Sequence, residues 1–243
     1  LTAFAGVNQR KNNFSRLTGT TNGGLVIADF YNLSNSAESP SSTNYESESR
    51  VNSVFGMASL GYKDTFFIEA SARQDWFSTV NDPAFYPSVS GSFVFSKVLN
   101  QDWLNFGKIR GGWAKVSSGG EPYQLDTYTE ARVSFNGVPR YSLPDKANNP
   151  NLKPEFKKTI EVGLEARMFK NRVGFDVTLY KTNTTDLITP LEVDPGVGYP
   201  QVMINAGEME NKGIEILVNV TPIKTDNFSW DVTWNFSKNE NKL

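Results

Sequence analysis

The feature that most constrains the fold is a strict alternation of apolar and polar residues over long segments. In residues 159–182, "TIEVGLEARMFKNRVGFDVTLYKT", every second residue up to Met168 is apolar, and Glu161 and Glu165 fall between them. The alternation restarts after Lys170-Asn171. A period of two predicts β-strands with one apolar and one polar face. The segment therefore predicts two long strands joined by a tight turn.

The same alternation recurs along the chain and predicts an all-β fold. It places nine strands at approximately residues 1–11, 51–62, 65–77, 86–98, 104–117, 155–169, 172–187, 208–221 and 227–239. Most are longer than the ~5–6 residues usual in soluble proteins. About ten residues of a tilted strand cross the ~25 Å apolar band of an outer membrane. Strand length favours an antiparallel up-and-down transmembrane β-barrel.

The connections between these strands are predicted to alternate in length. The tight ones are Lys63-Asp64 and residues 99–103, 170–171 and 222–227, and the long ones are residues 12–50, 78–85, 118–154 and 188–207. Outer-membrane barrels have short periplasmic turns and long external loops, whereas a soluble sandwich has no reason to sort its loops. The apolar run 24–33 within the first long loop is expected to be a packed loop segment, because a tenth strand would break the alternation.

Composition excludes several functional classes. The chain has no cysteine and no histidine, which excludes disulfide scaffolds, thiolate metal sites, Ser-His-Asp triads and histidine-bound zinc. An enzyme is therefore not expected, and no cofactor is predicted. The net charge of −2 comes from 24 basic and 26 acidic residues, so the basic field that nucleic-acid binding requires is lacking. No apolar run reaches the length of a transmembrane helix, and residues 1–13 show no signal peptide.

Two blocks of sequence carry a family resemblance. Residues 149–188, "NPNLKPEFKKTIEVGLEARMFKNRVGFDVTLYKTNTTDLI", and residues 205–218, "NAGEMENKGIEILV", resemble the signature of SusC/RagA-type TonB-dependent outer-membrane transporters. The matching positions are Asn149, Pro150, Leu152, Lys153, Pro154, Glu155, Glu161, Gly163, Tyr180, Thr184, Asp186, Leu187, Asn205, Gly207, Asn211, Gly213 and Glu215. Residues 24–36, 85–97 and 108–116 follow in family order, so the resemblance covers nearly the whole chain.

The resemblance implies a larger barrel than this chain provides. Family members have a plug domain and about twenty-two strands. An antiparallel meander closes only with an even number of strands, and nine would leave two bare edges in lipid. We therefore expect residues 1–243 to be an internal portion of the barrel domain, with the plug and the remaining strands lying outside the chain.

The resemblance also implies a function. It predicts part of an importer of large nutrients, oligosaccharides or peptides, in the outer membrane of a Gram-negative, Bacteroidota-like bacterium. The implied partners are TonB, which acts through the plug, and a SusD-like surface lipoprotein, together with outer-membrane lipid. A structural or secretion-complex barrel is one alternative. A soluble β-rich glycan-binding module is another.

Candidate functional residues lie on the strands and in the loops. Polar strand residues are expected to face the lumen or the plug: Glu161, Glu165, Arg167, Asp176, Glu215, Asn219, Asp231 and Asn235. Loop aromatics that offer stacking surfaces for sugar rings are Tyr123, Tyr128 and Tyr199, with Phe135 and Tyr141 as further examples. The alternative role of these aromatics is to pack the loops or to contact the lipoprotein lid.

Overall fold

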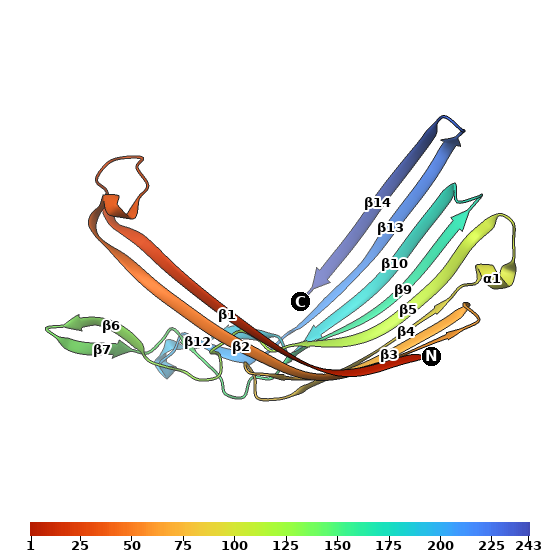
Figure 1. The fold of residues 1–243 in the computed structure, drawn as a ribbon. Coiled ribbons are helices and arrows are strands. Elements are labelled where there is room, and N and C mark those ends of the chain that lie inside the picture. The colour runs from red at the N-terminus through yellow and green to blue at the C-terminus, as the bar shows by residue number, and fades with distance from the viewer.

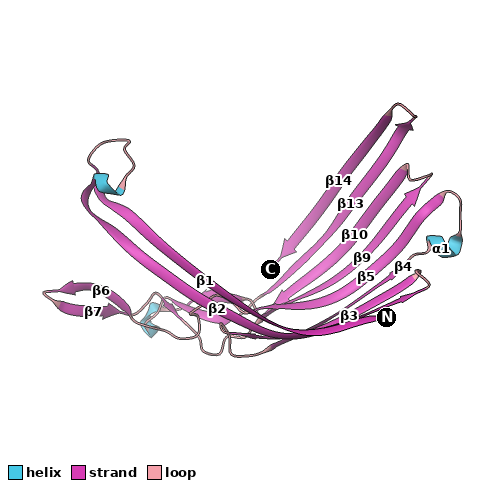
Figure 2. Cartoon of the chain, in the orientation of Figure 1, coloured by secondary structure: helices cyan, strands magenta, loops and turns pink.

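A nine-stranded antiparallel sheet forms most of the molecule (Figure 1 and Figure 2). The computed structural model describes residues 1–243, except for the side chain of residue 133. The strands of the sheet are β1 (Thr2–Leu25), β2 (Ser36–Tyr62), β3 (Phe66–Phe77), β4 (Ala84–Phe93), β5 (Leu104–Ser118), β9 (Glu155–Met168), β10 (Val173–Thr185), β13 (Glu208–Lys224) and β14 (Ser229–Lys242). They lie side by side in this order. The predicted all-β, up-and-down arrangement of nine strands is confirmed.

The sheet is curved and open, with β1 and β14 at its two edges (Figure 1). Tight turns and the short helix α1 (Ser96–Leu99) lie at one end, and the long loops lie at the other. Two small sheets belong to the loop end. One is the hairpin of β6 (Glu130–Phe135) and β7 (Val138–Ser142), and the other joins β11 (Ile188–Glu192), β12 (Gln201–Asn205) and β8 (Lys146–Ala147).

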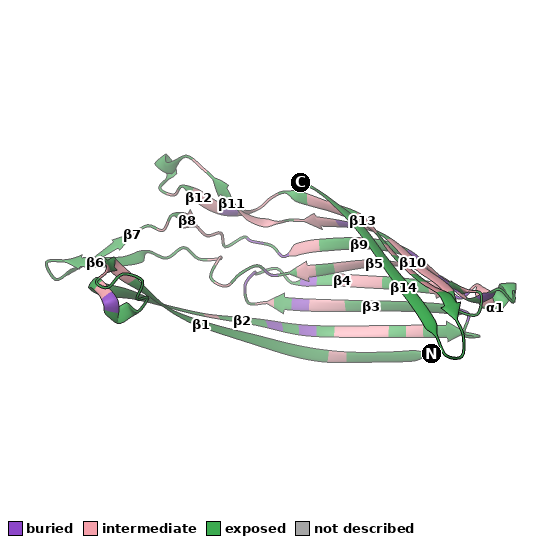
Figure 3. Cartoon of the chain, turned by 90° about the horizontal axis from the view of Figure 1, so that it is seen from above, coloured by how far each residue is buried: buried purple, intermediate pink, exposed green. Residues whose placement is uncertain are grey.

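The first long connection is mostly strand, which corrects the prediction of a loop over residues 12–50. Pairing between β1 and β2 continues without a break from Thr2–Ser59 to Thr20–Ser41. The far half is a two-stranded ribbon, here named the arm (residues 12–50), and its side chains are largely exposed on both faces (Figure 3). Backbone hydrogen bonds hold most of this ribbon, with side-chain contacts such as that of Phe14 with Tyr45. The ribbon has no continuous apolar face for alternation to reveal.

A hydrogen-bonded loop closes the tip of the arm. It confirms that residues 24–33 form no tenth strand, but the expected packing of this apolar run is wrong, because Val26, Ile27 and Tyr31 are more than half exposed. The buried side chain of Asn35 donates to the carbonyls of Ile27 at 2.8 Å and Phe30 at 2.7 Å, and accepts from the amide of Ile27 at 3.0 Å. Residues Leu33–Asn35 form a single turn of 3-10 helix. One amide side chain thus replaces the backbone pairing that a strand would supply.

The predicted sorting of connections by length fails at one pair. Strand β4 ends at Phe93 rather than near residue 98, so residues 94–103 form a longer connection than residues 78–83 at the loop end. The side chain of Val94 is buried, and the ring of Phe95 covers Gly107, where a Cβ atom would clash with it. The Phe95 ring thus lies against β5 at the point where the chain leaves the sheet and enters α1.

Little of the sheet is buried, and the compact core lies among the loops (Figure 3). Within the described side chains, one cluster of fully buried apolar residues is found, and it contains Val80, Leu152 and Met203. Phe77, Leu125 and Ile188 pack around it. No helix in the described part of the chain has the length and hydropathy needed to cross a membrane.

Candidate functional site

The register of the sheet divides its side chains into two faces, because residues directly opposite each other project to the same side. The polar face of β5, β9, β10, β13 and β14 carries Lys108, Arg110, Glu161, Glu165, Arg167, Asp176, Thr178, Glu215, Asn219, Asp231 and Asn235. The apolar face carries Ile109, Trp113, Ile160, Val162, Leu164, Val177, Leu179, Ile214, Ile216, Val218, Trp234 and Phe236. The predicted polar strand residues therefore share one face.

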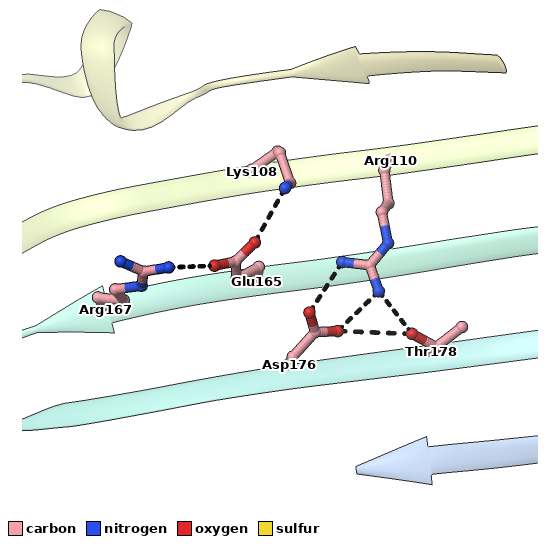
Figure 4. A network of polar contacts seen from close by, with 6 residues as sticks. All are labelled: Lys108, Arg110, Glu165, Arg167, Asp176 and Thr178. Carbon is pink, nitrogen blue, oxygen red and sulfur yellow. Dashed lines mark hydrogen bonds and ion pairs between the residues drawn. The ribbon is translucent and has the colours of Figure 1, made fainter. Parts of the chain in front are cut away.

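A bidentate ion pair crosses the middle of the polar face (Figure 4). Arg110 on β5 donates from Nη1 to Oδ2 of Asp176 at 2.9 Å and from Nη2 to Oδ1 at 2.8 Å. Nη2 also donates to Oγ1 of Thr178 at 2.7 Å. Asp176 and Thr178 belong to β10, so the guanidinium spans the intervening strand β9. This contact is here named the Arg110 bridge.

Gly163 makes the Arg110 bridge possible. It lies on β9 directly opposite both Arg110 and Thr178. A Cβ atom at this position would come within 2.6 Å of Nε and 2.7 Å of Cζ of Arg110. The missing side chain therefore leaves the space through which the guanidinium passes. Gly213, on β13, has the same role beside Tyr180, whose Cζ would lie 2.6 Å from an added Cβ.

A second ion pair lies beside the bridge and completes a network across three strands (Figure 4). Glu165 accepts from Nζ of Lys108 at 2.9 Å and from Nη2 of Arg167 at 2.9 Å. The side chain of Glu165 is only 17% exposed, so these partners offset the cost of removing its charge from water. The network joins three cations to two carboxylates, and its ion pairs fix these charged side chains against the sheet.

A third polar cluster lies across β2, β3 and β4. Asp75 is buried and accepts from Nε of Arg73 at 2.7 Å and from the hydroxyl of Tyr86. Nη2 of Arg73 donates to Ser53 at 2.7 Å. The guanidinium carbon of Arg73 lies 5.6 Å from the ring centre of Phe55, a cation–π geometry. Alternation alone does not reveal this cluster, because its members occupy ordinary polar positions of three strands.

A shallow hollow lies on the polar face beside the Arg110 bridge. Its polar lining comprises Arg110, Asp176, Thr178, Glu215, Asn235 and Ser237. These groups offer hydrogen-bond donors and acceptors along the wall. No group of three or more Asp or Glu residues within the described part of the chain is arranged to hold a metal ion.

The block "NPNLKPE" builds the loop end of the sheet. Asn205 accepts from the amide of Lys153 at 2.8 Å and donates to the carbonyls of Lys153 at 2.9 Å and Asp186 at 2.9 Å. Glu155 accepts from the amide of Ile188 at 2.7 Å. These contacts join the loop after β5 to the loop after β10.

Buried side chains of the same block reinforce this junction. Leu152 is 1% exposed and packs with Val80 and Met203, and Asn149 donates to the carbonyl of Met203 at 3.1 Å. These contacts, with those of Asn205 and Glu155, are here named the rim cluster. Its members come from three loops that are distant in the sequence. The motif residues in the rim cluster therefore organise the loops that surround the candidate site.

The three loop tyrosines occupy separate positions. Tyr123 is 56% exposed, and its hydroxyl accepts from the amide of Glu48 in the arm at 3.3 Å. Tyr128 is 68% exposed, and its hydroxyl donates to Asp126 at 3.4 Å. Tyr199 is half-buried in the loop that precedes β12. Among the described side chains, no ring contact joins these tyrosines, so their assignment to a ligand site stays a prediction.

The sequence matches a known family over almost its whole length. The family profile described as "TonB dependent receptor-like, beta-barrel" matches residues 2–242. A similar curated protein is TonB-dependent receptor P26 of Formosa agariphila, 32% identical over 224 residues, which are 88% of this chain and 23% of the relative. TonB-dependent receptor SusC of Bacteroides thetaiotaomicron is 26% identical over 215 residues, covering 83% of this chain and 21% of the relative.

The fold is also similar to that of a solved transporter. The structure titled "Structure of the RagAB peptide transporter" superposes with a TM-score of 0.81 at 20% sequence identity, covering 99% of this chain and 28% of that one. At 20% sequence identity, this similarity shows a shared fold and nothing more. The chain spans less than a quarter of the length of the two curated relatives.

Proposed function

Because this chain belongs to the TonB-dependent receptor β-barrel family, whose members are outer-membrane proteins and not enzymes, we propose that residues 1–243 form part of the wall of a nutrient importer. The observation that carries the proposal is the two-faced antiparallel sheet. Its apolar face suits contact with lipid, and its polar face, with the Arg110 bridge, suits contact with a plug and a water-filled lumen. The chain covers only 23% and 21% of the lengths of two curated relatives, which supports its place within a longer receptor.

The cargo of this importer is a large nutrient, either an oligosaccharide or a peptide. The likeness to SusC and to a peptide transporter supports import of this kind. Tyr123, Tyr128 and Tyr199 are the proposed contacts of the loops with the cargo, because tyrosine rings stack on sugars and pack against peptide side chains. TonB drives the import, and a SusD-like lipoprotein covers the loop end. The relatives are consistent with an outer membrane of the Bacteroidota type.

Growth of a strain that lacks the complete receptor tests this function. The strain is grown on a panel of glycans and peptides as sole carbon source, with the intact gene restored as the control. Loss of growth on one class, and the same loss when TonB is removed, is the expected result. Normal growth on every substrate overturns the importer and favours a structural or secretion-complex barrel. Release of the receptor from envelopes by buffer without detergent overturns the membrane-spanning wall itself.

A further inference from the structure

The apolar face ends in lysine on five neighbouring strands. On each strand, a lysine lies on this face two positions nearer the loop end than an apolar residue, and on β9 Phe156 lies beyond the lysine. The apolar residues are Trp113, Ile160, Leu179, Ile214 and Phe236. The lysines are Lys115, Lys158, Lys181, Lys212 and Lys238, here named the lysine belt. A lysine in the same relative position on every strand from β5 to β14 indicates a common environment at that level.

The lysines of the belt lie near one plane that crosses the strands at an angle. Lys115 is directly opposite Lys158, whereas Lys181 is opposite Ile160 and Lys238 is opposite Ile214. The level at which apolar residues give way to lysine therefore shifts by about one residue per strand from β5 to β14. Strands ~4.8 Å apart and tilted by ~40° give a shift of about 4 Å, or roughly one residue, per strand for a membrane plane. The belt thus has the slope expected of a membrane surface.

Positive charge exceeds negative charge along the belt. Lys181 pairs with Glu210 at 2.7 Å and Lys212 pairs with Glu240 at 3.7 Å, but both lysine side chains are more than half exposed, so the pairs are weak. The ammonium of Lys115 lies 3.6 Å from the ring centre of Phe156. Lys158 and Lys238 form no ion pair within the described side chains. Unpaired ammonium groups therefore remain directly above an apolar surface.

We propose that the lysine belt binds the anionic phosphate groups of lipids in the outer leaflet, an inference that rests on the proposed membrane-spanning wall. A lysine stem lies along apolar surface while its ammonium extends to the polar boundary. The ammonium is a compact point charge that suits phosphate. Acyl chains cover the apolar face, and the phosphates of the same lipids meet the belt. The occupant is thus an anionic phospholipid-like molecule rather than free phosphate.

The test is lipid selection by the complete receptor. The receptor is reconstituted in mixed bilayers of phosphatidylcholine and phosphatidylglycerol, and the lipids retained on release are counted by native mass spectrometry. The belt variant replaces Lys115, Lys158, Lys181 and Lys238 with glutamine. The matched control is Lys157→Gln, which changes the neighbouring residue on the polar face. Replacing the same four lysines with arginine keeps the charge.

We expect the intact receptor and the arginine variant to retain phosphatidylglycerol several-fold over phosphatidylcholine. The glutamine variant should lose this enrichment, and Lys157→Gln should keep it. Equal enrichment in the intact receptor and the glutamine variant overturns the belt, as does an equal loss in Lys157→Gln. Flotation of every variant with the vesicles is measured in parallel. A receptor that floats without lipid selection contradicts the belt alone, and one that does not float contradicts the membrane-spanning wall.

Discussion

Arg110 and Asp176 form a bidentate ion pair across a strand that has no side chain at the crossing point. The intervening residue is Gly163, and its hydrogen atom occupies the space that a Cβ atom would take from the guanidinium. The glycine and the ion pair are therefore one structural unit. This accounts physically for a glycine between two glutamates in the middle of a long strand, where glycine is ordinarily unfavourable.

Gly163→Ala is expected to displace Arg110 and weaken its bonds to Asp176. Alanine by itself favours a strand by ~0.5–1 kcal/mol over glycine, but hydrogen bonds to charged groups contribute ~1.5–3 kcal/mol. The net loss in the free energy of unfolding should be about 1 kcal/mol, measured by urea unfolding of the complete receptor in vesicles. Gly111→Ala is the control, because its Cβ would meet only ordinary contacts at 3.7 Å. Equal stability of the two variants contradicts this role.

A double-mutant cycle separates the ion pair from its surroundings. Arg110→Gln or Asp176→Asn should each destabilise the receptor by about 1–2 kcal/mol, because each leaves a partly buried charge without its partner. The side chains are 29% exposed, which places the effect at the low end for buried pairs. The double variant should be less unstable than the sum of the single variants. Additive losses in the same urea experiment would show that the two residues are not coupled.

A pair of arginine substitutions tests which face of the sheet contacts lipid. Val177→Arg places a charge on the apolar face, and it should cost ~2–4 kcal/mol near the membrane midplane. Ser237→Arg places the same charge on the polar face opposite Glu215, and it should fold with nearly normal yield in vesicles. Thr178 is unsuitable as the control, because its hydroxyl accepts from Arg110. Similar folding yields for the two variants would reverse or remove the assignment of faces.

The rim cluster should lose its packing when the side chain of Leu152 is shortened. Leu152→Ala removes a fully buried side chain from contact with Val80 and Met203, and such changes cost ~2–5 kcal/mol. The loops, rather than the strands, should open, and brief protease treatment of whole cells should cleave within residues 119–154. Leu191→Ala is the control, since Leu191 is 49% exposed. Cleavage at the same rate in both variants speaks against the cluster as the anchor of the loops.

Two loop tyrosines are expected to respond differently to substitution. Tyr123→Phe removes the hydroxyl that accepts from the amide of Glu48, so it should loosen the contact between the arm and the neighbouring loop. Hydrogen exchange of the Glu48 amide should rise several-fold while the ring stays available to cargo. Tyr128→Ala removes an exposed ring and should lower uptake of the cargo without changing that exchange. Normal uptake in Tyr128→Ala removes this residue from the proposed cargo site.

The strands of the sheet were predictable because their alternation reports two faces of different polarity. The same logic missed the arm, where Thr18 and Thr43 pair in a ribbon with no apolar side. Near the start of β1, Ala3, Ala5 and Val7 lie on the apolar face, and Phe4 lies on the opposite, polar face. The ring centre of Phe4 lies 6.1 Å from that of Phe55 in an edge-to-face contact on the polar face.

The pairing within the polar network was not predictable from single strands. Lys108 and Glu165 are adjacent only because β5 pairs with β9 across the long segment of residues 119–154. The alternation placed each residue on a polar side, but the register decides which partners meet. Gly163 is recognisable as a motif residue, but only the structure places Arg110 above it and explains why a glycine is needed. Residues of the rim cluster were likewise recognisable as a motif but not as a packing unit.

The gap beneath Arg110 also limits how β9 aligns with its neighbours. A slip of two residues keeps every side chain on its own face, so alternation alone does not prevent it. Such a slip would place Glu161 or Glu165 under the guanidinium instead of Gly163, and either side chain would occupy the path to Asp176. The offset between neighbouring strands sets the girth of a closed barrel. One missing side chain therefore helps to set the register on which the girth of a closed barrel depends.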